Sequence, residues 1–103
     1  MNESPYTAED RQRWKQRLLD KGQEISKKLE QVLAKKDVSL DDLKLKLDDD
    51  EKEPKEKRLR RYFDLIMARL RKVESSSFGF DRQRKTFLSV AELDEMPWID
   101  TDS

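Results

Sequence analysis

Apolar residues recur at helical spacing along the first third of the chain. Leu18, Ile25 and Val32 are seven residues apart, and Trp14 lies one turn before them. This spacing places the four side chains on one face of an α-helix and is typical of a coiled coil. Leu29 and Leu33 flank the same stripe. The pattern predicts a first long helix that ends at about Lys36.

Local signals mark the start of this helix and one interruption. Thr7 followed by Asp10 can cap the free amides of a first helical turn, so the helix is predicted to begin there. Gly22 interrupts the stripe at a cost of about 1 kcal/mol relative to alanine.

A second apolar stripe follows in the second half of the chain. Leu59, Ile66 and Val73 form a series with a spacing of seven, and Phe63 and Leu70 form a parallel series. Pro54 suits the first turn of a helix, and the serine run 75–77 ends it. The sequence therefore predicts a second long helix.

Two amphipathic helices joined by a short segment pack antiparallel, so the register can be predicted. The predicted pairs are Leu18 with Val73, Ile25 with Ile66, and Val32 with Leu59, whose residue numbers all add up to 91. The turn is then centred near residues 45 and 46. Such a hairpin is a rod about 40 Å long at 1.5 Å per helical residue.

The segment that joins the helices allows two local structures. Ser39 and Asp42 can cap a short helix that carries Leu40, Leu43 and Leu47, and this is the favoured interpretation. The alternation of leucines at 43, 45 and 47 also fits a strand. In both cases the acidic residues of this segment are expected at the far end of the rod.

The C-terminal residues predict a small apolar module. The apolar residues are Phe78, Phe80, Phe87, Leu88, Val90, Leu93, Met96 and Trp98. Ser89 followed by Glu92 is a capping-box signal for a short helix that ends before Pro97. The alternative is that this segment is disordered, because it offers few apolar residues.

These patterns give an all-α fold class: an antiparallel two-helix coiled-coil hairpin with a small C-terminal module that contains a short helix. Residues 1–6 are expected to be a flexible N-terminus. The hairpin covers 7–74, with an acidic tip around 39–51. The C-terminal module covers 75–103.

Composition narrows the function classes. The 103 residues are 45% charged and 34% hydrophobic, and they include no cysteine and no histidine. A disulfide framework, a conventional zinc site and histidine acid–base chemistry are therefore excluded. The chain has no apolar run of about 18 residues and no signal-peptide pattern. We expect a cytoplasmic protein without a cofactor.

Charge is balanced overall but segregated along the chain. The net charge is zero, yet residues 41–53 hold seven acids and three lysines, whereas residues 55–72 hold eight bases and two acids. The two blocks carry net charges of −4 and +6. Such blocks are often solvated helix faces, and they can also be docking surfaces for a large charged partner.

The second half of the chain resembles the DnaK-suppressor family of bacterial transcription factors (DksA/TraR). The resemblance covers about residues 55–103 and depends on the stretches "RLRRYFDLIMARLRKVESSSFGFD" and "LSVAELDEMPW". In that family a coiled-coil hairpin leads through a glycine turn into a small zinc ribbon. The ligand spacing of the family places the four zinc positions at Asp81, Arg84, Asp102 and residue 105. The resemblance therefore implies a zinc-less variant, in which apolar packing replaces the metal.

The same resemblance implies a transcription regulator that binds RNA polymerase through the hairpin. Acidic residues at the tip act on the polymerase in the family, and the corresponding candidates are Asp41, Asp42, Asp48, Asp49 and Asp50. The candidates for a basic flank that contacts the partner are Arg58, Arg60 and Arg61. The family's Asp-x-x-Asp-x-Ala tip signature is absent from this segment. A related hypothesis, ranked lower, is that the tip assists transcript cleavage by helping to hold a second metal, as in the Gre factors.

Three other classes are weighed against this hypothesis. The first is a non-catalytic helical adaptor or dimerisation module that acts through its apolar seam. Direct nucleic-acid binding is disfavoured by the zero net charge. An independent enzyme is disfavoured because a two-helix rod offers no pocket in which pKa values could shift. The oligomeric state stays open.

Overall fold

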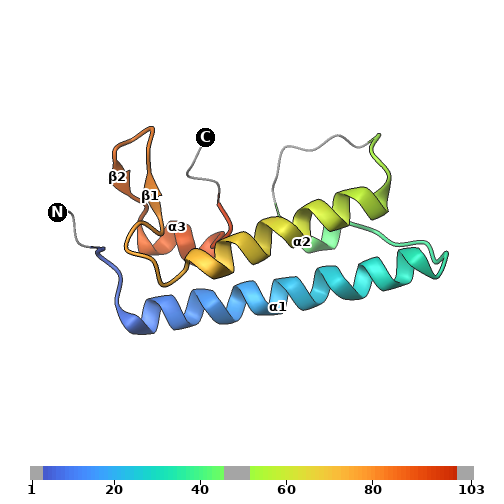
Figure 1. Cartoon of the computed structure of the whole chain (residues 1–103), viewed down its shortest axis with the longest axis horizontal. Helices are drawn as coiled ribbons and strands as arrows, with labels where there is room; N and C mark the ends of the chain where they lie inside the picture. Colours follow the sequence, from blue (N-terminus) through green and yellow to red (C-terminus); the bar gives the residue numbers. More distant parts are fainter. Residues whose placement is uncertain (1–3, 46–51, 100–103) are drawn as a thin grey trace.

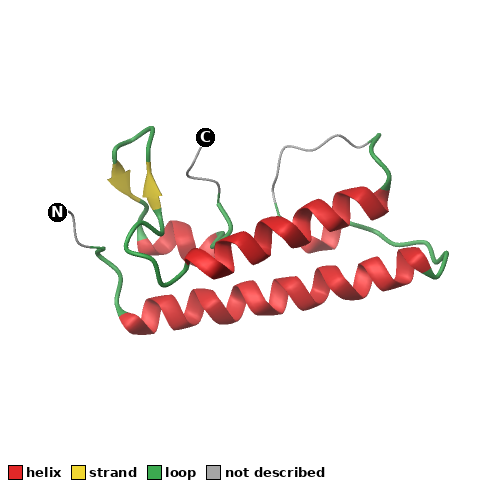
Figure 2. Cartoon of the chain, in the orientation of Figure 1, coloured by secondary structure: helices red, strands yellow, loops and turns green. Residues whose placement is uncertain are grey.

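The chain is mainly helical, with two long helices packed antiparallel and a small module at one end (Figures 1 and 2). The structure is a computed structural model, which describes residues 4–45 and 52–99. The elements in chain order are α1 (Ala8–Leu33), the 3₁₀ turn η1 (Asp41–Leu43), α2 (Lys55–Lys72), β1 (Phe80–Asp81), β2 (Thr86–Phe87) and α3 (Val90–Glu95). This confirms the predicted fold class. Within the described ranges, no helix is both long enough and apolar enough to cross a bilayer.

Helix α1 begins as predicted and ends slightly early. Thr7 Oγ1 accepts a hydrogen bond from the Asp10 amide at 3.0 Å, and the Asp10 carboxylate accepts one from the Thr7 amide at 3.0 Å. The helix ends at Leu33 because Lys35 takes a positive φ of 66°. The Lys36 and Lys35 amides then bond back to the carbonyls of Gln31 and Val32. This pair of bonds is a Schellman motif, which stops the helix without glycine.

Helix α2 begins directly after Pro54, which is its N-cap and not a member of its first turn. The fixed φ of proline suits the start of a helix at either position. The last turn of α2 carries Arg69, Arg71 and Lys72. Cations there are favoured by the negative end of the helix dipole.

The core of the shaft lies between α1 and α2. The side chains of Leu18, Ile25, Leu59 and Ile66 are fully buried there. A Cβ on Gly22 would lie 3.0 Å from Met67 Cε and 3.7 Å from Ile66 Cγ2. Glycine therefore permits a close helix approach, which explains its place in the stripe. The approach of Gly22 to Ile66 and Met67 agrees with the predicted helix register to within one turn. The three predicted residue pairs stay predictions.

The segment after α1 folds back along the shaft instead of extending beyond it (Figure 1). Val38, Leu43 and Leu45 are buried, and the Leu43 carbonyl accepts a hydrogen bond from Lys21 Nζ at 2.8 Å. Lys21 lies twelve residues before the end of α1, which corresponds to about 18 Å along the helix axis. We call residues 38–45 the strap. Within it, Asp42 pairs with Lys28 of α1, and Asp41 lines a hollow with Lys55 at the start of α2.

The predicted short helix of this segment is only one 3₁₀ turn, Asp41–Leu43. Ser39 does not form the expected capping box. Its hydroxyl instead accepts a hydrogen bond from the Asp41 amide at 3.3 Å. The predicted participation of Leu47 lies outside the described residues.

The C-terminal module combines a β-hairpin with a short helix. β1 and β2 pair antiparallel, with Phe80 opposite Phe87. The Ser89–Glu92 capping box of α3 is present, as predicted. Four of the predicted apolar residues are buried, namely Phe78, Leu88, Leu93 and Trp98, whereas Val90 is exposed. The two-residue strands were not predicted, because they are too short to give an alternating pattern.

Tyr6, which falls in the expected flexible segment 1–6, is packed against this module, and residues 1–3 of that segment lie outside the described residues. Its ring is buried and packs edge-on against Trp14, with centroids 4.8 Å apart, and against Phe87, at 5.8 Å. Its hydroxyl donates a hydrogen bond to the Leu88 carbonyl at 2.7 Å. An aromatic residue directly before the N-cap was the available signal, because that position often holds a hydrophobic staple.

Candidate functional site

Asp42 is paired with α1 and lies beside the shaft. Its carboxylate is 2.7 Å from Lys28 Nζ, which also donates a hydrogen bond to the Ser39 carbonyl at 2.7 Å. The hydrogen bond and charge of Lys28 lower the pKa of Asp42. The negative charge of Asp42 is therefore largely matched within the chain itself.

The strap is fastened to the C-terminal module as well as to α1. Trp98 Nε1 donates a hydrogen bond to the Leu45 carbonyl at 2.9 Å. Lys21 Nζ lies 5.5 Å from the centre of the Trp98 ring, within the range of a cation–π contact. Sequence reasoning missed this junction, because only the tertiary fold brings Lys21, Leu45 and Trp98 together.

The remaining predicted acids fall in two places. Asp41 is exposed and lines a shallow hollow together with Lys55 and Arg58. The structure thus brings Asp41, a predicted acid of the tip, close to Arg58, a predicted base of the flank. Asp48, Asp49 and Asp50 lie outside the described residues.

The far end of the shaft, as far as the structure describes it, carries several lysines. Lys35 and Lys36 are exposed just beyond α1. Lys55, at the start of α2, donates a hydrogen bond to the Val38 carbonyl and lies 3.4 Å from the Asp37 carboxylate. The described part of this end therefore carries three lysines beside the acids Asp37 and Asp41.

The predicted basic flank lies on the first two turns of α2. Arg58 Nε donates a hydrogen bond to the Tyr62 hydroxyl at 3.2 Å. Arg60 is 3.9 Å from Glu56, and Arg61 is paired with Glu53. Arg60 and Arg61 remain about half exposed, at 58% and 49% of their side-chain surface, so both can reach a partner. Exposed pairs of this kind contribute at most about 1 kcal/mol and can exchange partners readily.

An ion pair occupies the positions at which the resemblance places the first two zinc ligands. Asp81 Oδ2 lies 3.3 Å from Arg84 Nε, and Asp81 Oδ1 accepts hydrogen bonds from the amides of Gln83 and Arg84 at 2.9 and 3.4 Å. Arg84 also lies 3.3 Å from Glu92 of α3. Opposite charges thus close the turn and tie it to α3.

Metal ligands do not gather in this module. No group of three or more histidine, cysteine, aspartate or glutamate residues in the described ranges is placed to hold a metal ion. Arginine at position 84 is a cation and cannot donate a lone pair to zinc. Asp102, the third ligand position of the resemblance, lies outside the described residues.

A second polar junction fastens α3 to α1. Asp94 Oδ1 accepts hydrogen bonds from Trp14 Nε1 at 2.8 Å and from Arg13 Nε at 2.9 Å. These two donors, the indole first, lower the pKa of Asp94. The junction satisfies the polar atom of Trp14, whose side chain is fully buried. The lowered pKa of Asp94 therefore follows from the contact that holds α3 against α1.

Comparison with known proteins gives no relative of this chain. No family model, no curated protein and no solved structure matches it.

Proposed function

We propose that this chain is a cytoplasmic, non-catalytic transcription regulator that binds bacterial RNA polymerase through its helical hairpin. The observation that carries the proposal is the C-terminal module, where the turn at the zinc-ligand positions is closed by the Asp81–Arg84 ion pair. That arrangement accounts for a metal-free module at the base of a hairpin. The resemblance implies a module in which apolar packing replaces the metal, and the buried side chains of Phe78, Leu88, Leu93 and Trp98 support this.

The buried seam favours this proposal over an adaptor that works through apolar contacts. Ile25, Leu59 and Ile66 are fully buried between α1 and α2, so they are not available to a partner while the hairpin is intact. The outer faces of the helices are charged. A partner would therefore meet charged side chains, and electrostatic complementarity would govern the association rate and the specificity.

The folded-back strap changes how the hairpin would act on the polymerase. Asp42 lies beside the shaft, paired with Lys28, whereas Lys35, Lys36 and Lys55 lie at its far end. We therefore propose that the described far end and the adjacent basic flank contact acidic surface on the polymerase. Asp42 mainly holds the strap in place through its ion pair with Lys28.

A pull-down with purified RNA polymerase from the same host tests this surface. The variant R60Q/R61Q removes two charges from the basic flank and should reduce retention several-fold, because both side chains are exposed. The control variant K15Q/K27Q removes the same charge from α1 and should bind like the wild type. Equal loss in both variants, or no retention of the wild type at micromolar concentration, would contradict the proposal.

A further inference from the structure

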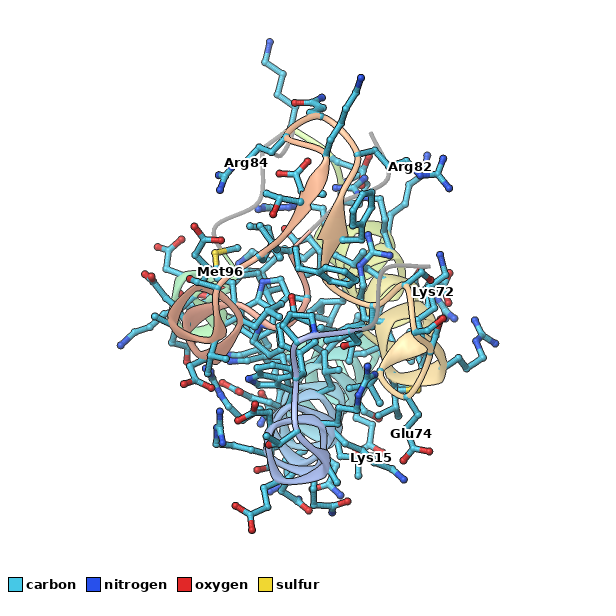
Figure 3. The ribbon with its side chains drawn as sticks, turned by 90° about the vertical axis from the view of Figure 1, so that its left-hand side faces the viewer. Lys15, Lys72, Glu74, Arg82, Arg84 and Met96 are labelled. Carbon is cyan, nitrogen blue, oxygen red and sulfur yellow. The ribbon has the colours of Figure 1, made fainter. Side chains whose placement is uncertain are left out.

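The strap and the C-terminal module cover only one side of the α1–α2 pair. Among the described helices and strands, α2 packs only against α1. The strap and α3 both lie on one flank of α1, where they contact Lys28 and Trp14. On the opposite flank Lys15 Nζ lies 3.7 Å from Glu74 Oε1, and these two side chains are 41% and 72% exposed. Figure 3 shows this pair between the two helices, on the side away from Met96 at the end of α3.

Two exposed leucines lie on this outward side of residues 15–33 and 57–74, which we call the open face. Leu19 is 36% exposed and Leu33 is 51% exposed, and they are two of the three large apolar side chains that are exposed in the described chain. Both share the flank of Lys15, since Leu19 follows it by about one helical turn and Leu33 by about five. The open face therefore offers a narrow apolar stripe that a partner helix can cover.

Two contacts fix the level of α1 against α2 along the rod. Lys15 contacts Glu74. A Cβ on Gly22 would lie 3.0 Å from Met67 Cε. In both contacts the residue numbers add up to 89, so residues of the two helices with that sum lie level with each other.

The open face carries complementary charges on its two helices. Three charged residues on each helix alternate in sign along the rod, and all six are exposed: Asp20, Lys27 and Glu30 on α1, and Arg71, Asp64 and Lys57 on α2. Asp20 also accepts a hydrogen bond from Gln16 at 3.0 Å. Each charge is within two residues, or about 3 Å along the axis, of being level with an opposite charge on the other helix.

We propose that a second copy of the chain covers the open face and forms a symmetric dimer. A two-fold axis parallel to the rod sets α1 of one copy antiparallel to α2 of the other, and it allows no sliding along the rod. The levels within one chain are then kept between the copies. Three kinds of opposite-charge pair therefore form across the interface, each of them twice: Asp20 with Arg71, Lys27 with Asp64, and Glu30 with Lys57. This self-complementary order of charges points to a second copy as the occupant.

The open face is large enough only for a weak dimer. Helix α2 has 18 residues and is about 27 Å long, and two packed helices present a width of about 20 Å. The dimer then buries about 500 Å² per copy, which is near the lower limit for specific interfaces. We therefore expect a dissociation constant of about 10–100 μM at low salt. At the micromolar concentrations of the pull-down the chain is mainly monomeric, so the dimer does not compete with the proposed polymerase contact.

Sedimentation equilibrium of the full-length chain from about 5 to about 500 μM, at about 0.05 M salt, tests the dimer. We expect reversible dimerisation that weakens several-fold when the salt is raised to about 0.5 M. The single variants K27E and D64K should each weaken it by about tenfold, since each sets like charges against each other twice in the dimer. The double variant K27E/D64K should dimerise about fivefold more tightly than either single variant, because opposite charges face each other again. The variants E30K, K57E and E30K/K57E repeat the comparison at a second pair.

A matched control separates these contacts from net charge. R82E makes the same charge change as K27E on the turn between β1 and β2, where Figure 3 shows Arg82 far from Lys15 and Glu74. It should change the dissociation constant less than about twofold, and circular dichroism checks that every variant keeps its helices. A wild type that stays monomeric at about 500 μM, double variants as weak as the single ones, or an R82E variant as weak as K27E would overturn the dimer. The assay contains no polymerase, so its result is independent of the proposed function.

Discussion

Tyr6 precedes the first helix, yet its side chain is one of the main links between the N-terminus and the C-terminal module. Its hydroxyl bonds to the Leu88 carbonyl, and its ring lies against Trp14 and Phe87. Burial raises the pKa of Tyr6 to about 12. The folded state therefore retains the phenolic proton at pH values where the unfolded chain loses it.

Substitution of Tyr6 by phenylalanine should have opposite consequences at neutral and alkaline pH. At pH 7, Y6F loses one buried hydrogen bond and should be less stable by about 1 kcal/mol. The wild type should lose stability between the unfolded pKa of about 10 and the folded pKa of about 12, because only the unfolded state deprotonates there. Y6F should show a smaller decline over that range. Urea unfolding at pH 7 to 11 measures both effects, and equal alkaline slopes would contradict the assignment.

The two glycines of the chain are expected to respond differently to alanine. Gly79 has a φ of +81°, and its Cβ would lie 2.8 Å from Tyr6 Cε2, so G79A should cost about 2–4 kcal/mol. At Gly22 the nearest atom is the flexible end of Met67, and alanine gains about 1 kcal/mol of helix propensity. G22A should therefore stay within about 1 kcal/mol of the wild type. Thermal or urea unfolding compares the two, and a similar cost in both would refute this explanation.

At the scale of elements, local signals predicted more than tertiary contacts did. The capping boxes at Thr7 and Ser89 depend on residues three apart, so the sequence identifies the starts of α1 and α3 directly. The end of α1 depends on a lysine with a positive φ, which has no clear sequence signal. The sequence did not predict that the strap folds back along α1. Asp42 pairs with Lys28 across a reversal of the chain, and the spacing of apolar residues gives no signal for such a reversal.

The strap can be tested by chemical cross-linking, since the chain has no native cysteine. If the segment extended α1 as a continuous helix, residues 28 and 42 would lie about 21 Å apart. In the strap their charged groups are in contact, so K28C/D42C should cross-link efficiently with a short bis-maleimide. K15C/D42C is the control and should not, because Lys15 lies about 20 Å further along α1. Failure of K28C/D42C to cross-link, with both thiols reactive, would refute the strap.

The candidate site shows the same division between local and tertiary information. The basic flank was predicted from the arginines of one helix, and the structure places Arg60 and Arg61 at its surface. The cluster of Lys21, Leu45 and Trp98 could not be predicted, since its members come from three segments far apart in the sequence. Charge counts likewise gave a block of acids but not the position of Asp42 beside the shaft.

As a whole, the molecule is a rod with principal extents of 50 × 26 × 19 Å, whose apolar seam is closed. The module, the strap and the N-terminal tyrosine meet at or along the shaft, so the surface left for a partner is mainly charged. We therefore expect its affinity for a partner to depend on ionic strength.

Equilibrium binding of the purified wild-type chain to RNA polymerase from its own host tests the proposed function most directly. The account predicts saturable one-to-one binding with a dissociation constant of about 1 μM or lower at about 0.1 M salt, weakened when the salt is raised to about 0.5 M. Biolayer interferometry with immobilised polymerase measures both values. No saturable binding up to about 50 μM, or binding that is insensitive to salt, would contradict the account.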